Sequence, residues 1–177
     1  MPEPTLAYGY MDSPIGRLLL AGDRDGLHRI GFETEDWTDQ PPTEWRRDDA
    51  IITEPAAQLR AYFAGELTTF DLALTFTGTA FQNTVWSALQ DIPFGETTSY
   101  GALARRIARP KACRAVGAAN GANPLPIVVP CHRVIGSDGS LTGFGGGIDA
   151  KRFLLDHEQN VRRKKRFETT PPAATSR

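Results

Sequence analysis

The stretch TSYGALARRIARPKACRAVGAANGAN, residues 98–123, decides the fold of the second half of this chain. Thr98 or Ser99 can cap a helix that runs to about Ile107, because a hydroxyl at this position accepts a hydrogen bond from the first turn. Pro110 fits the first turn of a second helix that ends near residues 120–121. Two short helices joined by a few residues predict a helix-turn-helix, which is common in DNA-binding proteins.

The second of these helices consists mostly of alanine and glycine. Its only long side chains are Lys111, Arg114 and Asn120. Such a helix can pack tightly inside the protein, or it can lie close to a nucleic-acid groove. A helix that reads the major groove carries several long polar side chains, so this composition does not favour sequence-specific reading.

The formal net charge of -1 conceals a division between the two halves of the chain. Residues 1–94 carry 6 Lys or Arg against 15 Asp or Glu, a net of -9, and residues 95–177 carry 14 against 6, a net of +8. This division predicts that the second half faces a polyanion. The alternatives are two surfaces of one molecule that attract each other, and a solvated basic tail at residues 162–166.

The first half has the pattern of an α/β unit. GRLLLAG and GLHRIGF flank the turn residues DRD, which predicts a hairpin. FDLALTF, residues 70–76, alternates strictly and predicts a half-buried strand. Between them, Thr53 or Glu54 can cap a helix that ends at Gly65. We therefore expect an N-terminal α/β domain over residues 1–78, with a small antiparallel sheet and a helix.

A mainly α-helical unit follows from about Thr79. Apolar residues recur at helical spacing between residues 81 and 92, and Pro93 stops the pattern. After the helix-turn-helix, residues 148–160 predict one more helix. We expect a C-terminal domain over residues 79–160. Residues 161–177 are charged and then rich in Pro, Thr and Ala, which predicts a disordered tail.

The segment NPLPIVVPCHRVIG, residues 123–136, places Cys131 directly beside His132. Pro126 and Pro130 bracket the apolar run IVV, which suits a short buried strand that ends at a rigid corner. A free cysteine has a pKa of about 8.5 and needs a base to become a good nucleophile. Neighbours on a strand point to opposite faces, so His132 reaches Cys131 only through a turn or a bridging water.

A histidine base needs an acceptor that orients its ring. Glu158 is the candidate, with Asp156 and Asp138 as competitors. The plainer interpretation is an inert buried cysteine and a structural histidine. The two cysteines and three histidines show no paired spacing such as CxxC, so a metal site is not indicated.

The glycine-rich loop GSLTGFGGG, residues 139–147, lacks the GxxxxGK[ST] pattern of phosphate-binding loops. We interpret it as a backbone wall for a ligand, with Phe144 as its apolar part, or as a set of turns. The chain has no long apolar run and no basic-then-apolar N-terminus. With only two cysteines, this pattern predicts a cytoplasmic protein without a membrane span.

Taken together, these motifs resemble a known family. PCHRVIG at residues 130–136 is similar to the active-site signature of the O6-alkylguanine-DNA alkyltransferases, and SYGALA, RAVGAANGANP, LTGFGGG and KRFLLDHE follow the family's order. The resemblance implies direct-reversal DNA repair without a cofactor. A damaged guanine is flipped out of the duplex, and its O6-alkyl group, mainly methyl, moves irreversibly onto Cys131. O4-alkylthymine is a further expected substrate.

The resemblance also implies roles for single residues. Cys131 matches the alkyl acceptor, His132 the base that acts through a water, and Glu158 the acid that orients this base. Asn123 matches the residue that fixes the turn around the cysteine, and Tyr100 matches the one that assists the leaving guanine. Arg114 matches the arginine that fills the gap left by the flipped base.

Further residues follow from the same resemblance. The implied partner is double-stranded DNA, bound in the minor groove by a protein that is monomeric without DNA. The implied DNA-binding residues are Tyr100, Lys111, Arg114, Ala115, Gly117 and Arg133. The implied substrate pocket contains Val134, Phe144 and Gly145.

The chain also departs from the family pattern. Phe144 stands where many members carry tyrosine, and Gly145 stands where some carry serine, so polar contacts to the substrate change. The zinc ligands of some members and an additional N-terminal domain have no counterpart in this sequence. The rival interpretations are a cysteine hydrolase with a Cys-His-Glu relay and a non-catalytic helix-turn-helix protein.

Overall fold

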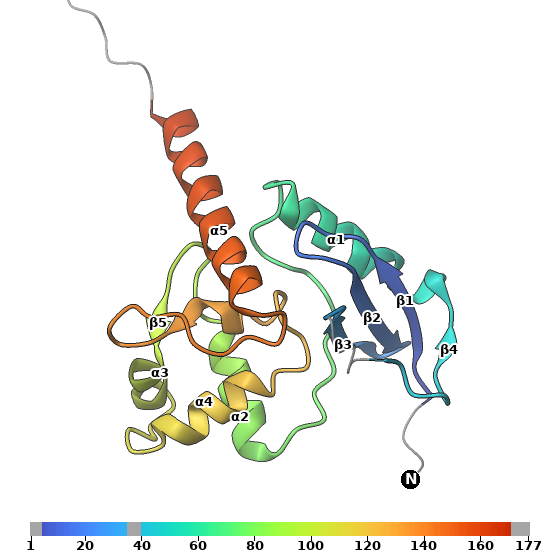
Figure 1. Cartoon of the computed structure of the whole chain (residues 1–177), viewed down its shortest axis with the longest axis horizontal. Coiled ribbons are helices and arrows are strands. Elements are labelled where there is room, and N and C mark those ends of the chain that lie inside the picture. Colours follow the sequence, from blue (N-terminus) through green and yellow to red (C-terminus); the bar gives the residue numbers. More distant parts are fainter. Residues whose placement is uncertain (1–4, 35–39, 171–177) are drawn as a thin grey trace, which may run out of the picture.

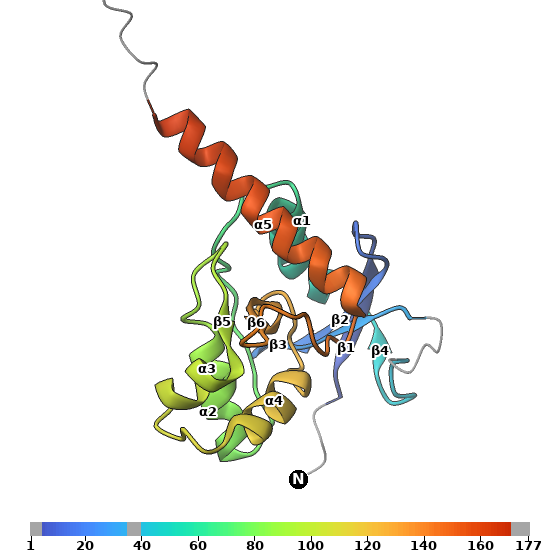
Figure 2. The same cartoon turned by 60° about the vertical axis from the view of Figure 1, so that its left-hand side comes forward.

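The computed structural model describes residues 5–34 and 40–170 (Figure 1). The strands are β1 (Ala7–Met11), β2 (Leu18–Asp23), β3 (Gly26–Phe32), β4 (Arg46–Arg47), β5 (Thr98–Ser99) and β6 (Val134–Ile135). The helices are α1 (Thr53–Phe63), α2 (Ala80–Leu89), α3 (Tyr100–Arg106), α4 (Cys113–Gly121) and α5 (Ile148–Thr169), with 3-10 turns η1 (Asp49–Ile52) and η2 (Cys131–Arg133). Figures 1 and 2 show the sheet and α1 beside a helical second half, so the predicted two-part architecture is confirmed.

The N-terminal sheet has the strand order β3-β2-β1-β4. β2 pairs antiparallel with β1 and with β3, which confirms the hairpin predicted around DRD. The short β4 pairs parallel with β1. The sheet is therefore mixed and not purely antiparallel as predicted, because the chain crosses from β3 to the far side of β1 before it forms β4.

The helix α1 covers the inner face of this sheet. Leu18 and Leu20 of β2 share one hydrophobic core with Leu59 of α1. The helical turn begins earlier than the sequence indicated, since Asp48 caps η1 by accepting a hydrogen bond from the Ala50 N–H. The predicted caps Thr53 and Glu54 therefore lie inside the helix.

The segment 70–76 keeps its predicted alternation but is not a strand. Phe70, Leu72 and Leu74 are partly buried against the core, and the residues between them are exposed. Its only strand-like contact among the described residues is a bridge to Leu27, which donates to Ala73 O and accepts from Thr75 N at 2.9 Å each. The segment thus contacts β3 only near the start of that strand, so no continuous ladder of backbone hydrogen bonds forms.

The helix-turn-helix is formed by α3 and α4, which pack on each other and on α2. Ser99 caps α3 by accepting a hydrogen bond from Ala102 N. α4 begins at Cys113 and not at Pro110, because residues 108–112 form the turn and Ala108 has a φ of 58°. The Trp86 indole of α2 donates to Ala119 O at 2.8 Å and fixes α4 in place.

The last helix is longer than its sequence pattern predicted. α5 continues to Thr169, so the prediction of disorder is wrong for residues 161–169, and residues 171–177 lie outside the described residues. Ala150, Leu154, Glu158 and Val161 hold the first four turns in the core, and the end of the helix projects from the body (Figures 1 and 2). Of the helices within residues 5–34 and 40–170, none has the length and apolar character needed to cross a membrane.

Candidate active site

Cys131 follows a tight turn, not the predicted strand. Ile127 has a φ of 74°, an uncommon conformation for a β-branched residue. The Val129 N–H donates to Leu125 O at 2.8 Å, so the IVV run folds back on itself. Closely spaced prolines restrict the backbone but do not supply a partner strand. The prediction of a strand from the apolar run IVV was therefore wrong.

Asn123 braces this turn at both ends. Its Nδ2 donates to Val129 O at 2.8 Å, and its Oδ1 accepts from Leu125 N at 3.0 Å. The predicted position of Asn123 at the turn around the cysteine fits these two bonds. The backbone of Cys131 is held further by Asn120 of α4, whose Nδ2 donates to Cys131 O at 3.4 Å.

Cys131 and His132 lie together in η2, where both side chains are buried. Nε2 of His132 lies 2.7 Å from Oε1 of Glu158 on α5, and both residues are at most 1% exposed. Nδ1 of His132 is buried and has no hydrogen-bond partner in the parts of the chain that are described. The structure therefore brings the three predicted residues together, with one ring nitrogen bound to the acid and the other open to a further partner.

Glu158 is the centre of a dense hydrogen-bond network. In addition to His132, its carboxylate accepts from the Tyr62 hydroxyl at 2.8 Å and from Gly95 N at 3.1 Å. Arg133 binds both carboxylate oxygens at 2.9 Å and donates to Ile92 O at 2.6 Å. Burial opposes ionisation of Glu158, but His132 and Arg133 hold its pKa well below the usual range. The carboxylate is therefore ionised at neutral pH.

The position of Arg133 contradicts its predicted role in DNA binding. The residue is only 6% exposed, and each of its three guanidinium nitrogens donates a hydrogen bond to Glu158 or to Ile92 O. A fixed bidentate pair of this kind suits arginine because its planar fork matches a carboxylate. Arg133 is thus the counter-ion that allows Glu158 to be charged in the interior.

Cys131 and His132 are both neutral groups in this environment. Burial raises the pKa of Cys131 to about 11, although a hydrogen bond with Asn123 and the charge of Lys151 act in the opposite direction. Burial also lowers the pKa of His132, against the influence of Glu158. Because the imidazole of His132 is neutral, it can accept the proton of the Cys131 thiol.

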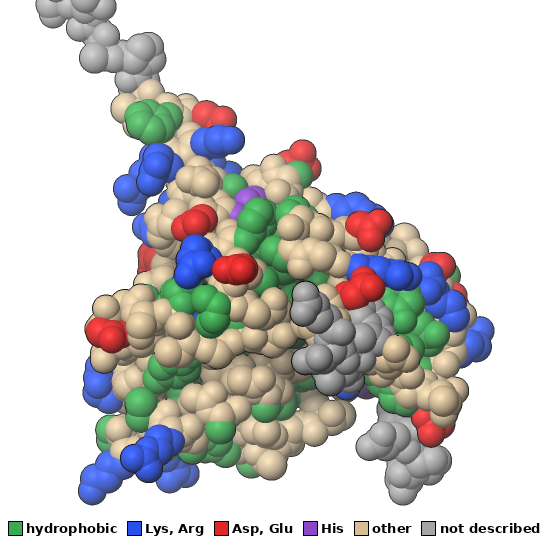
Figure 3. All heavy atoms as spheres, in the orientation of Figure 1, with side chains coloured by type: hydrophobic (Ala, Val, Ile, Leu, Met, Phe, Trp, Pro, Cys, Tyr) green, Lys and Arg blue, Asp and Glu red, His purple; other side chains and the backbone are tan. Residues whose placement is uncertain are grey.

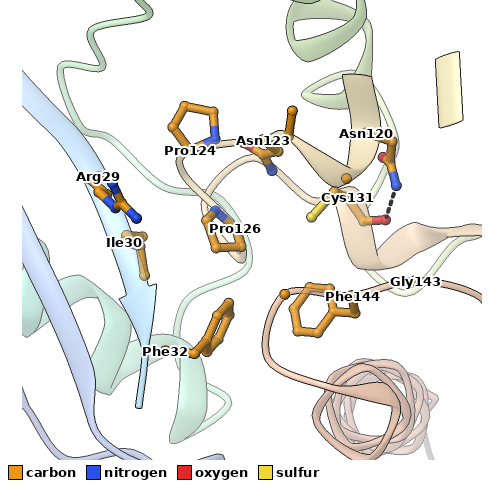
Figure 4. Close-up of a pocket in the computed structure, with 13 residues that line it drawn as sticks. Arg29, Ile30, Phe32, Asn120, Asn123, Pro124, Pro126, Cys131, Gly143 and Phe144 are labelled. Atoms are coloured by element: carbon orange, nitrogen blue, oxygen red, sulfur yellow. Dashed lines mark hydrogen bonds between the residues drawn. The ribbon is translucent and has the colours of Figure 1, made fainter. Parts of the chain in front are cut away.

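A cavity of about 420 Å³ opens over Cys131 (Figure 4). Phe144, Gly145 and Gly143 of the glycine-rich loop form one wall, and Asn123 and Pro126 of the turn form another. Phe144 and Gly145 therefore line the same cavity as Cys131, and their contact with a substrate stays a prediction. Val134 does not line the cavity, because its side chain is fully buried in the core.

The contribution of β3 to this cavity was not predicted from the sequence. Arg29, Ile30 and Phe32 form a wall beside Pro124 and Pro126 of the turn and across from Cys131 (Figure 4). The Phe32 ring lies 5.3 Å from that of Phe144, and Ile30 N donates to Pro124 O at 2.9 Å. No local pattern in β3 differs from that of an ordinary hairpin strand, so its role follows only from the packing of the two halves.

A second hollow of about 360 Å³ adjoins the first along α4. Tyr100, Arg114 and Gly117 line it, and Asn120 and Gly143 line both hollows. The Tyr100 hydroxyl lies 3.0 Å from the Thr142 hydroxyl.

Several residues of the helix-turn-helix are exposed. They include Arg114, which lines the second hollow, and also Lys111 and Ala115. Lys and Arg side chains gather over α3 and the turn to α4 at the lower left of Figure 3. Of the predicted DNA-binding residues, Tyr100, Arg114 and Gly117 line the second hollow, and Lys111 and Ala115 are exposed.

Comparison with known proteins assigns this chain to a family. The model of the 6-O-methylguanine DNA methyltransferase DNA-binding domain matches residues 80–160, and that of the family's ribonuclease-like domain matches residues 6–76. The chain belongs to the 6-O-methylguanine DNA methyltransferase family.

Individual relatives agree with the family assignment. A methylated-DNA–protein-cysteine methyltransferase of Methanosarcina acetivorans is 50% identical over 85% of this chain and 97% of its own length. The corresponding protein of Mycobacterium tuberculosis is 52% identical over 86% of this chain and 92% of its own length. The crystal structure of Mycobacterium tuberculosis OGT in complex with DNA has a TM-score of 0.82 at 50% identity and covers 88% of this chain and 94% of that chain. This chain is accordingly a DNA-repair methyltransferase with a cysteine of the protein as acceptor.

This member of the methyltransferase family offers no evident metal centre in residues 5–34 and 40–170. No group of three or more His, Cys, Asp or Glu side chains in these ranges is arranged to hold an ion. The remaining free thiol, Cys113, is exposed at the start of α4, whereas Cys131 is buried at the cavity. The two thiols therefore differ in exposure, and each lies at a different hollow.

Proposed function

We propose that the protein removes the alkyl group from O6-alkylguanine in duplex DNA by transferring it to Sγ of Cys131. The observation that carries the proposal is the position of Cys131 at a cavity of about 420 Å³ beside the pair His132–Glu158. The product is a thioether, and nothing in this chemistry regenerates the thiol. Each protein molecule then acts once.

The proton of the thiol leaves through His132. Its unpaired Nδ1 is the atom that accepts the proton, through a water that lies between the imidazole and Sγ. Ionised Glu158 stabilises the imidazolium that forms. This relay yields a thiolate only when it is needed, which suits a thiol whose pKa is raised to about 11 by burial.

The transfer step breaks one bond and forms one bond. Sγ attacks the alkyl carbon, and the bond from this carbon to guanine O6 breaks with its electrons remaining on the base. The base then takes up a proton at N1, with Tyr100 as the group that assists the leaving guanine. The Tyr100 hydroxyl is already positioned by Thr142 at the edge of the second hollow.

The lesion reaches Cys131 by flipping out of the helix. α4 enters the minor groove, where its small residues permit close approach, and exposed Arg114 fills the place of the extruded base. Extrusion costs a few kcal/mol and least for poorly paired bases, so lesions are favoured without a sequence code. The shared lining of the two hollows supports a short path from α4 to the thiol.

The finer scope of the activity belongs to the same proposal. O4-alkylthymine is the second substrate, since it carries an alkyl group on a comparable exocyclic oxygen. The protein approaches DNA as a monomer and acts in the cytoplasm. Phe144 contributes an apolar wall and no hydroxyl to the cavity, so recognition of the base relies on backbone groups of residues 143–145.

Mass spectrometry after incubation with a duplex that contains O6-methylguanine tests this proposal. We expect a gain of one methyl group per protein, located on Cys131 and absent in Cys131→Ser. The control Cys113→Ser changes the exposed thiol and should react normally. Repeated turnover without modification would identify a hydrolase instead, and binding without transfer would identify a non-catalytic DNA-binding protein.

The role of Arg114 needs a separate test. Arg114→Ala should slow transfer from duplex DNA more than transfer from the free alkylated base, because only the duplex requires flipping. Arg60→Ala, an exposed arginine at the end of α1, is the control. Equal losses on both substrates would contradict the proposed role of Arg114.

A further inference from the structure

The projecting end of α5 carries a basic segment, residues 162–166, with the sequence RRKKR. Arg162 is tied to the body through Gly95 O at 3.2 Å and Glu96 at 3.6 Å. The other four side chains are exposed, and none of them forms an ion pair with a described residue. These four residues are Arg163, Lys164, Lys165 and Arg166. Figure 3 shows Lys and Arg side chains around this part of the helix.

The basic segment is an unfavourable helix by itself. Arg163 and Arg166 are three residues apart and Arg162 and Arg166 are four apart, so like charges face each other along the helix. The segment has no apolar face to bury, because every residue from 163 to 170 is exposed, including Phe167 at 76%. Proximity to the negative end of the helix dipole offsets only part of this repulsion. A bound polyanion would remove it.

The basic segment also lies far from the proposed DNA-binding face. In Figures 1 and 2, which differ by a turn about the vertical axis, α3 and α4 lie at the bottom and the end of α5 lies at the top. One straight duplex docked on α4 therefore does not pass along the basic segment. We propose that the end of α5 is a second DNA-binding surface, which holds a separate duplex segment by its phosphates.

Duplex DNA is the occupant that the charges favour. Four unpaired cations around a projecting helix match a continuous line of phosphates and need no sequence or pocket. The inference rests on the proposed binding of DNA by α3 and α4, and together the two surfaces make the protein a bridge between two duplexes. The competing occupant is the acidic N-terminal half of a second copy, with its net charge of -9 over residues 1–94.

The decisive experiment measures energy transfer between two differently labelled undamaged duplexes that are mixed with the full-length protein. The test variant is R163Q/K164Q/K165Q/R166Q, since glutamine keeps helix propensity while it removes charge. The matched control is R24Q/R46Q/R60Q/R152Q, which changes the net charge equally at exposed sites elsewhere. We expect bridging by the parent and the control and its loss in the test variant.

Salt gives a second, quantitative readout. Release of counterions from four phosphate contacts weakens capture of the second duplex by about 150-fold between 50 and 200 mM NaCl. Methyl transfer from a short duplex should stay within about twofold in both variants, because the surface for that reaction is unchanged. If the parent protein showed no methyl transfer, this result would refute the proposed function, whether or not the protein bridges two duplexes.

Three outcomes would overturn the inference. They are absence of bridging by the parent, equal bridging by both variants, and a protein dimer that forms without DNA and is lost only in the test variant. The last outcome would assign the basic segment to a second copy. Size-exclusion chromatography with light scattering, without DNA, distinguishes this case from the first two.

Discussion

Replacement of Arg133 by methionine separates the two roles considered for this residue. The substitution keeps an unbranched side chain but leaves the Glu158 carboxylate, which is 1% exposed, without its bidentate partner. Removal of one member of a buried ion pair costs about 3–5 kcal/mol. We therefore expect Arg133→Met to lower the free energy of unfolding by this amount, as measured by urea denaturation at pH 7.

The pH dependence of this loss identifies its cause. Burial opposes the charge of Glu158, yet His132 and Arg133 lower its pKa in the folded protein. In the parent, the carboxylate therefore stabilises the fold fully at pH values above its unfolded pKa. This stabilisation is lost as the pH falls through the folded pKa. Without Arg133 the folded pKa rises, and the carboxyl becomes protonated and needs no cation. The stability difference between parent and variant should therefore shrink as the pH falls through the raised folded pKa of Glu158 in the variant, where the carboxyl becomes protonated.

Arg114→Met provides the opposite control, because Arg114 is exposed on α4. This variant should keep its stability within about 0.5 kcal/mol but bind duplex DNA more weakly, with a shallower salt dependence. Arg133→Met, where folded, should keep the salt dependence of the parent. Unchanged stability of Arg133→Met together with a salt slope reduced by about 1 would show that Arg133 contacts phosphate and would refute the assignment to Glu158.

Three more outcomes follow from the site. Without DNA, iodoacetamide at pH 7 should label exposed Cys113 faster than Cys131, since burial raises the pKa of Cys131 to about 11 and limits access, and peptide mapping measures the ratio. Gly146→Ala should lower the free energy of unfolding by about 1–3 kcal/mol, because a Cβ there lies 2.9 Å from the Phe32 ring, whereas at Gly145 the distance is 3.7 Å and Gly145→Ala should be tolerated. Tyr62→Phe removes one donor to Glu158 and should slow single-turnover methyl transfer without changing DNA affinity, which quenched-flow and anisotropy measurements check in parallel.

Local signals in the sequence were sufficient where one segment determines its own conformation. Ser99 before α3 and the DRD turn between β2 and β3 are patterns of a few residues, and both appear as expected. The strand predicted at IVV does not form. A strand there would need a neighbouring strand to pair with, and the local sequence does not specify one. An apolar run becomes a strand only beside another strand, and here Asn123 offers the backbone a turn instead.

The reacting residues of the site could be predicted from the sequence, but the residues that hold Glu158 in place could not. Cys131, His132 and Glu158 were found through the family's motifs, and the structure brings the histidine and the acid within 2.7 Å. Tyr62 donates to Glu158 across 96 positions of sequence, and Gly95 does so across 63. Contacts at such separations depend on how the two halves pack. For the same reason a basic residue beside the cysteine was assigned to DNA, although Arg133 serves the buried acid.

The arrangement of α4 explains how one short helix can serve both DNA and the acceptor thiol. Its outer face presents Arg114, and its last turn presents Asn120, which donates to Cys131 O and lines both hollows. The indole of Trp86 fixes the same turn through Ala119 O. A displacement of α4 on DNA would therefore move the cysteine backbone with it. In the proposed mechanism, the small residues of α4 let it approach DNA without such a displacement, so we expect the fold to set the register between a flipped base and Cys131 before DNA binds.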